Sequence, residues 1–176
     1  SSVFSTTNSR TAVLFYCLGT TFKQSGSNAT NFVRIDKQYA IEIARMAASS
    51  YVSHAYLVSS MGSNSKALFL YPRTKGEIAE AWMRIFQGKH VFIARPSLLL
   101  TEKRGDSRPL ESVAQAMAPV LNALCNSLAK LKKYSAITVA NVARAMIRDF
   151  ERSLSIESVK AQIVESHVLQ MIADEH

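Results

Sequence analysis

The sequence contains few of the residues that build disulfide frameworks or metal centres. Its 176 residues include only two cysteines, Cys17 and Cys125, which lie far apart. The four histidines show no i, i+4 pairing and have no cysteine near them: His54, His90, His167 and His176. The sequence therefore predicts no metal site and indicates a reducing compartment.

Long apolar segments are absent as well. No run of roughly 18 apolar residues could form a membrane span. Residues 1–11 lack the basic and apolar segments that make a secretory signal. We expect a cytoplasmic location, with nuclear or mitochondrial association as the alternatives.

The sequence has 13 acidic residues against 21 lysines and arginines, and its formal net charge is +8. An excess of positive charge raises the question of a nucleic-acid partner. No helix-turn-helix, zinc-finger or aromatic-rich RNA motif accompanies the two basic clusters, which are Lys103, Arg104 and Arg108, and Lys130, Lys132 and Lys133. Nucleic-acid binding is therefore not favoured, and a phosphorylated cofactor or substrate explains the charge at least as well.

Glycine is scarce in the places where a dinucleotide fold needs it. A complete fold of this kind opens with a strand and a Gly-x-Gly-x-x-Gly turn, which brings the backbone against the pyrophosphate. This chain has six glycines, and no two are close enough to form that turn: Gly19, Gly26, Gly62, Gly76, Gly88 and Gly105.

The apolar residues that are present predict a parallel sheet. Runs at residues 12–18, 55–60 and 91–95 lack polar alternation, which is typical of strands buried on both faces. Helical periodicity separates them. Residues 71–86 form one predicted helix; the other has Asn31 as its N-cap and the apolar face Phe32, Ile35, Tyr39, Ile43 and Met46. This alternation predicts an α/β doubly wound, Rossmann-like architecture.

The C-terminal part should contain further helices. We expect helical structure at residues 111–133, interrupted at Pro119, and a helix at 138–152. A short strand at 161–164 precedes a last helix after Ser166. The whole chain, 1–176, is predicted to be one partial domain: a flexible start at 1–11, a strand–helix core at 12–95, and a substrate-side and C-terminal helical part at 96–176.

The first apolar strand begins almost at once, with no earlier strand to pair with its free edge. A fully apolar strand at a sheet edge is an aggregation hazard. We therefore expect that N-terminal strands are missing and that the chain is partial. The alternative is that another subunit covers the edge.

The stretch LVSSMGSNSKALFLYPRTKGE, residues 57–77, carries the chemistry. It predicts a strand that ends in two serines, a polar loop, and a helix that opens near Tyr71, with Lys75 on the same helix face. An ammonium group next to a tyrosine favours the phenolate, so the pair could exchange a proton with a carbonyl or alcohol. Tyr-x-x-x-Lys alone is a weak motif, and its position after a serine-ended strand gives it weight.

Most of the chain between residues 12 and 146 resembles the atypical short-chain dehydrogenase/reductase family. Within it, the similarity is to the oxidoreductase group of the HIV Tat-interactive protein. The segments that carry the resemblance occur in the family's order: FYCLGTT, NFVRIDKQY, LVSSMGSNSKALFLYPRTKGE, ARPSLLL, EKRGDSRPLE and ITVANVARAM. Family members place a glycine-rich turn and two further strands before the first of these, and this chain lacks that section.

The resemblance implies roles for particular residues. Tyr71 and Lys75 match the family's catalytic pair, and Ser60 its serine, with Ser59 as the second choice. The residues implied to contact the cofactor are Gly19, Thr20, Thr21, Lys75, Pro96 and Ser97. Serine at position 97 replaces the family's glycine, which leaves that contact open, and the asparagine of the classical tetrad has no assigned counterpart.

The function implied is NAD(P)H-dependent hydride transfer on an unknown small carbonyl or alcohol. The cofactor would be NADP or NAD, with binding impaired by the missing glycine-rich turn. Whether this chain is itself an active enzyme stays open. The alternative is a non-catalytic regulatory module on the same scaffold, which would have protein partners.

Overall fold

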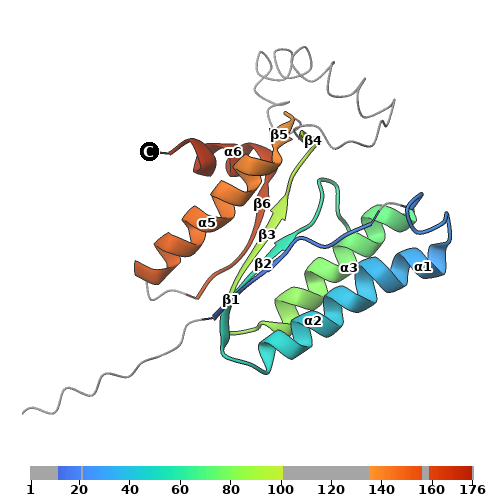
Figure 1. The fold of residues 1–176 in the computed structure, drawn as a ribbon, viewed down its shortest axis with the longest axis horizontal. Helices are drawn as coiled ribbons and strands as arrows, with labels where there is room; N and C mark the ends of the chain where they lie inside the picture. The colour runs from blue at the N-terminus through green and yellow to red at the C-terminus, as the bar shows by residue number, and fades with distance from the viewer. Residues whose placement is uncertain (1–11, 21, 101–134, 156–158, 176) are drawn as a thin grey trace, which may run out of the picture.

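A computed structural model describes residues 12–20, 22–100, 135–155 and 159–175. Its centre is a sheet of four parallel strands in the spatial order β1-β2-β3-β6 (Figure 1). The strands are β1 (Ala12–Tyr16), β2 (Val52–Val58), β3 (His90–Arg95) and β6 (Ala161–Glu165). The predicted parallel α/β sheet of a partial Rossmann-like fold is confirmed, and β1 lies at one edge of it.

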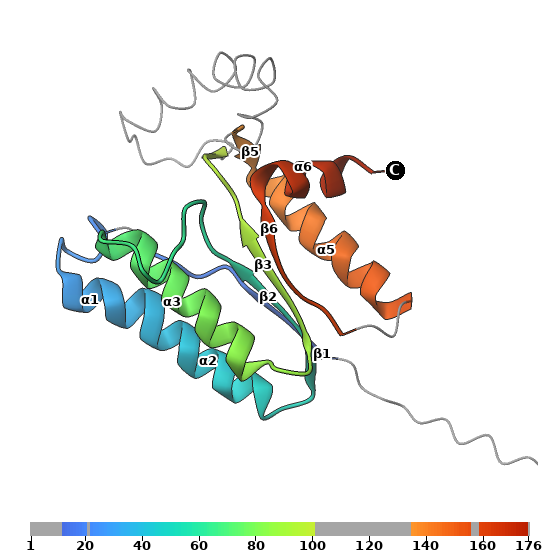
Figure 2. The same cartoon turned by 180° about the vertical axis from the view of Figure 1, so that it is seen from behind.

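Helices cover both faces of the sheet (Figures 1 and 2). One face carries a continuous helix, made of α1 (Ala29–Val33), a π-helical segment (Arg34–Gln38) and α2 (Tyr39–Ala48), together with α3 (Leu70–Ile85). The other face carries α5 (Val139–Ser155) and α6 (Ser166–Asp174). The short strands β4 (Leu99–Leu100) and β5 (Ile137–Thr138) form a second, two-stranded parallel sheet that the sequence did not predict.

The two central strands, β2 and β3, contribute side chains to two separate hydrophobic cores. Successive side chains of a strand point to opposite faces. In β3, Val91 and Ile93 join the core under α2 and α3, whereas Phe92 and Ala94 join the core under α5 and α6. This explains why the strand is apolar at each position from Val91 to Ala94. Trp82 is fully buried in the first core.

The first helix buries a different face from the one predicted. Its fully buried residues are spaced by four: Phe32, Asp36, Ala40 and Ala44. Of the predicted apolar face, Tyr39, Ile43 and Met46 are exposed. The small alanines let the helix approach α3, where the Trp82 Nε1 donates to the Ala40 carbonyl at 3.2 Å. The cap also differs, since the Asn28 side chain accepts from the Asn31 amide at 3.1 Å.

Other predictions have mixed outcomes. The helix predicted at 71–86 is α3, and the strand predicted at 161–164 is β6. Cys17, expected inside a buried strand, lies just after β1 and is exposed, so that expectation was wrong. The predictions for residues 101–134, including Arg104 and Arg108, lie outside the described residues. Across the described ranges, no helix is both long and apolar enough to cross a membrane.

Candidate active site at the carboxyl end of the sheet

The carboxyl ends of β1, β2 and β3 lie together, because the strands are parallel. Three loops leave the sheet there: the first contains Gly19 and Thr20, the second begins with Ser59 and Ser60, and the third begins with Pro96 and Ser97. In open α/β sheets, ligands bind in the crevice at this end of the strands. All the predicted site residues that the structure describes therefore lie on loops or on the first turns of α3 near this end. Thr21 lies outside the described residues.

Lys75 is buried and paired with a carboxylate that the sequence reading missed. Its Nζ lies 2.8 Å from Oδ2 of Asp36. Only 8% of Lys75 and 1% of Asp36 is exposed. The contact is an ion pair rather than an aligned hydrogen bond, since Oδ2 accepts no hydrogen bond of good geometry. Each partner offsets the cost of taking the other's charge out of water.

Asp36 reaches this position from the π-helical segment Arg34–Gln38. A π-turn adds a residue to the helical repeat, and such turns are frequent at functional sites. One signal in the sequence pointed to Asp36. It shares a four-residue spacing with Phe32, Ala40 and Ala44, so it belongs to the buried face of its helix.

The loop after β1 is joined to the same pair. The Thr20 amide donates to Oδ1 of Asp36 at 2.6 Å. A Cβ placed on Gly19 would lie 3.2 Å from Lys75 Nζ and 3.7 Å from Asp36 Oδ1. Glycine thus leaves room directly beside the ammonium group. Three of the residues expected to contact a cofactor, Gly19, Thr20 and Lys75, lie together here.

Tyr71 lies on the same face of α3 as Lys75, with its ring centre 5.9 Å from Nζ. Its ring packs at 5.9 Å from that of Phe32, which is fully buried. Tyr71 itself is 42% exposed. The tyrosine therefore has one side against the protein and one side open to solvent, as a group that meets a substrate would.

The two candidate serines differ in accessibility. Ser59 is buried, and its Oγ lies 3.0 Å from that of Ser63. Ser60 is only partly buried, with its Oγ 3.4 Å from the Ser63 Oγ. Ser60 is thus the better placed of the two to meet a substrate. Among the described residues, no hydrogen bond links either serine to Tyr71 or Lys75.

The serine loop packs tightly against α3. A Cβ on Gly76 would lie 2.1 Å from the backbone nitrogen of Ser65 and 2.3 Å from the backbone carbon of Asn64. The Asn64 amide donates to the Pro72 carbonyl at 3.0 Å. Gly76 is therefore required for the loop to approach the first turns of α3, which carry Tyr71 and Lys75.

Pro96 and Ser97 make their hydrogen bonds with residues other than Tyr71 and Lys75. The Pro96 carbonyl accepts from the Met61 amide at 2.9 Å, which ties this loop to the serine loop. The Ser97 hydroxyl donates to the Ser135 carbonyl and lies 3.0 Å from the Ser166 Oγ at the start of α6. Within the described residues, no contact joins Ser97 to Tyr71 or Lys75.

The fold and the site define a Rossmann-like α/β protein with a tyrosine, a lysine and an aspartate at the carboxyl end of its sheet. No protein-family model matches the chain. It is similar to Protein HTATIP2 of Rattus norvegicus, with 34% identity over 135 residues that make up 77% of this chain and 52% of that protein.

Two fungal relatives are similar over shorter stretches. The mitochondrial protein fmp52 of Emericella nidulans is 32% identical over 117 residues, which cover 66% of this chain and 49% of the relative. The mitochondrial protein FMP52 of Candida albicans is 35% identical over 105 residues, which cover 60% and 45%. The chain thus spans about half the length of the relatives it matches. These similarities support the predicted resemblance to the Tat-interactive protein group.

Proposed function

We propose that the chain carries the proton-transfer part of a short-chain dehydrogenase/reductase-type oxidoreductase, which moves hydride between NADP or NAD and a small carbonyl or alcohol. The observation that carries the proposal is the buried ion pair of Lys75 and Asp36, whose charged atoms lie 2.8 Å apart. The Lys75 Nζ of this pair lies 5.9 Å from the ring centre of Tyr71. A buried ammonium group next to a half-exposed tyrosine is suited to acid–base chemistry. The resemblance to the HTATIP2 group adds the reaction type.

The residues fit the ribose and nicotinamide end of such a cofactor. The absence of a side chain on Gly19 leaves open the space beside Lys75 Nζ. An ammonium has three N–H donors, so Lys75 can pair with Asp36 and still donate to ribose hydroxyls. When bound, the nicotinamide would supply or accept the hydride. For the pyrophosphate end the chain offers no Gly-x-Gly-x-x-Gly turn.

Each residue then has one task. Tyr71 donates a proton to the carbonyl oxygen during reduction and removes one from the alcohol in the reverse direction. Lys75, whose ammonium lies 5.9 Å from the Tyr71 ring centre, holds the ribose of the cofactor beside the tyrosine. Asp36 acts through Lys75, as a positioning residue that fixes the ammonium. Ser60, with Ser59 as the second choice, holds the carbonyl oxygen as negative charge develops on it.

A fluorescence titration with NADPH tests the proposal. We expect weak binding by the 176-residue chain and clear binding by a version extended at its N-terminus with the glycine-rich section of a relative. The Lys75→Met variant of the extended version should lose affinity. The Lys37→Met variant is the matched control, because Lys37 also pairs with a carboxylate, that of Glu77 at 2.8 Å, but its side chain is about one-third exposed.

A non-catalytic, protein-binding module on the same scaffold is the second candidate. The observation that favours it is a row of exposed apolar side chains on one helix: Tyr39, Ile43 and Met46. Absence of NADPH binding by both versions, with both correctly folded, would favour this module over the enzyme. Nuclear, cytoplasmic or mitochondrial residence follows from neither candidate, although the fungal relatives are named mitochondrial.

A further inference from the structure

Large apolar side chains are exposed on the loops around the Tyr71 site. The loop that follows β1 presents Leu18 and Phe22, and the loop between β2 and α3 presents Met61, Leu68 and Phe69. We call these five side chains the apolar rim. Leu68 is 91% exposed and Phe69 is 79% exposed, directly before the helix that carries Tyr71. Exposed apolar side chains that gather in this way are typical of binding sites.

Aromatic and backbone contacts connect the apolar rim to Tyr71. The ring centre of Phe22 lies 6.3 Å from that of Phe32, which lies 5.9 Å from that of Tyr71. The Phe69 carbonyl accepts from the Arg73 amide at 3.2 Å, so Phe69 belongs to the same first turn of α3 as Tyr71. The rim therefore reaches the tyrosine from both loops.

The polar side chains of the two loops are used within the loops themselves. The Ser25 hydroxyl donates to a backbone carbonyl at 2.7 Å, and the Ser63 hydroxyl also donates to a carbonyl of its own loop. The side chains of Asn28 and Asn64 accept from backbone amides at 3.1 Å and 2.9 Å. These groups stabilise the turns, and the side chains that the loops present to a ligand are largely apolar.

The charges of the loops narrow the ligand further. Their described residues, 17–20, 22–28 and 59–69, include Lys23 and Lys66 but no aspartate or glutamate. A cationic ligand would find no acidic partner on them. A polyhydroxylated ligand would bury hydroxyl groups against the apolar rim, which costs free energy unless each hydroxyl is hydrogen-bonded. The loops thus fit an uncharged or anionic ligand with an apolar body.

We propose that the substrate of the Tyr71 site is a carbonyl compound or alcohol with an aliphatic or aromatic body that packs against the apolar rim while its oxygen meets Tyr71. This inference rests on the proposed oxidoreductase function and names the class of substrate for it. Each methylene that the rim covers should improve binding by up to about fourfold.

Titration of the 176-residue chain with prodan, an aryl ketone with a naphthalene body whose emission shifts to the blue in apolar surroundings, tests the apolar rim without a cofactor. We expect saturable binding that Phe69→Ser weakens by about 10-fold, the scale set by one large apolar side chain. Phe69 is the N-cap of α3, where serine is favoured, so this variant should fold, which circular dichroism checks.

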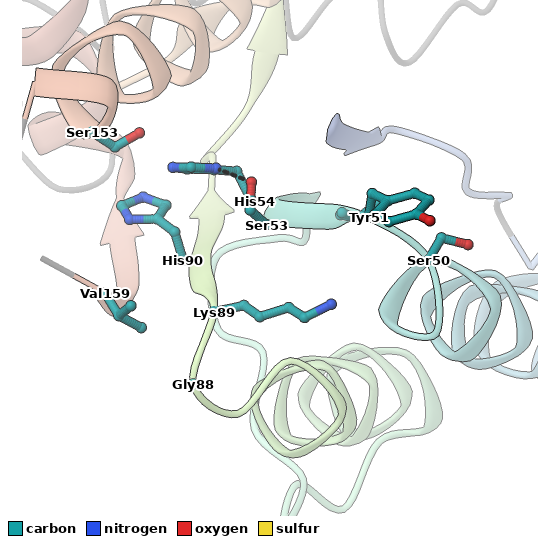
Figure 3. Close-up of a pocket in the computed structure, with 10 residues that line it drawn as sticks. Ser50, Tyr51, Ser53, His54, Gly88, Lys89, His90, Ser153 and Val159 are labelled. Carbon is teal, nitrogen blue, oxygen red and sulfur yellow. Dashed lines mark hydrogen bonds between the residues drawn. The ribbon is translucent and has the colours of Figure 1, made fainter. Parts of the chain in front are cut away.

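Tyr51→Ser is the matched control. Tyr51 is about as exposed as Phe69, but it lies at the amino end of the sheet, where it lines a cavity of about 430 Å³ with His54 and Lys89 (Figure 3). This variant should bind prodan as the unchanged chain does. If Tyr51→Ser weakens binding as much as Phe69→Ser, the probe does not report the apolar rim and the proposal is overturned.

Competition identifies the chemistry that the rim selects. Octan-2-one should displace prodan, butan-2-one should do so less well, and dihydroxyacetone should not displace it. Equal displacement by octan-2-one and dihydroxyacetone would overturn the proposal, as would binding that never saturates. Prodan affinity that falls as the protein concentration rises would show that a second copy covers the rim, which also overturns it.

Turnover separates this inference from the function on which it rests. In the N-terminally extended version, reduction by NADPH should favour octan-2-one over dihydroxyacetone. Reduction of both at the same rate would overturn the substrate class and leave the oxidoreductase function standing. Saturable prodan binding at the rim without reduction of any carbonyl would instead contradict the oxidoreductase function.

Discussion

The Lys75 ammonium lies 2.8 Å from the Asp36 carboxylate, and both groups are buried beside the loop that contains Gly19. This contact joins the helix that follows β1 to the helix that follows β2. It also places a fixed positive charge 5.9 Å from the Tyr71 ring centre. The stability of the fold and the proposed chemistry therefore depend on the same ion pair.

Asp36→Ala should lower the free energy of unfolding by about 3–5 kcal/mol, because it leaves a buried ammonium without its partner. Urea unfolding followed by circular dichroism measures the loss. Glu77→Ala is the control, since the Lys37–Glu77 pair has the same 2.8 Å separation but is about one-third exposed on each side. That change should cost less than about 1 kcal/mol. Equal losses for the two variants would contradict the importance given to the buried pair.

Gly76→Ala should destabilise the fold by about 1–3 kcal/mol, because the new methyl group would overlap backbone atoms of the serine loop. At an open helix position the same change stabilises by up to about 1 kcal/mol. The sign of the effect, measured by urea unfolding, therefore reports the close approach of Asn64 and Ser65 to α3. A stabilised variant would show that the loop does not pack as described.

Tyr56 should make the fold sensitive to alkaline pH. Burial raises the pKa of its hydroxyl well above the usual value, and the neighbouring Asp149 carboxylate raises it further. A folded-state pKa above the unfolded value, about 10, means that the stabilisation is complete below that pH and is lost as the pH rises past it. Unfolding measured across this range should depend less steeply on pH in Tyr56→Phe.

Tyr51→Phe serves as the comparison for that experiment, because Tyr51 is largely exposed. The pKa of Tyr16 is also raised by burial, so Tyr56→Phe should remove only part of the pH dependence. If Tyr56→Phe and the unchanged chain lose stability in parallel above pH about 10, Tyr56 does not contribute as described.

The sequence predicted the strands and most helices because local signals define them. The apolar runs correspond to β1, β2 and β3, and the periodic segments correspond to the helices around them. The sequence reading predicted the wrong buried face for the first helix, because alanine is only weakly apolar. Ala40 and Ala44 are buried because their small side chains let the helix approach its neighbour. That property matters only once α3 packs beside it.

The site was predictable only in part, for a related reason. Tyr71 and Lys75 are four residues apart on one helix, so spacing alone places them on one face. The pairing of Lys75 with Asp36 connects segments that are distant in the sequence. Such contacts follow from the order and direction of the strands, which no local pattern encodes.

The carbonyl-reductase activity of Tyr71→Phe, in the N-terminally extended version with NADPH, tests the central claim most directly. Tyr39→Phe is the matched control, because Tyr39 is 40% exposed and Tyr71 is 42% exposed, and Tyr39 has no role in the proposed reaction. We predict that Tyr71→Phe keeps its fold and its NADPH affinity but loses at least about 100-fold in turnover, the usual share of a general acid. Tyr39→Phe should keep its turnover. Undiminished turnover by Tyr71→Phe would contradict the assignment of Tyr71 as the proton donor.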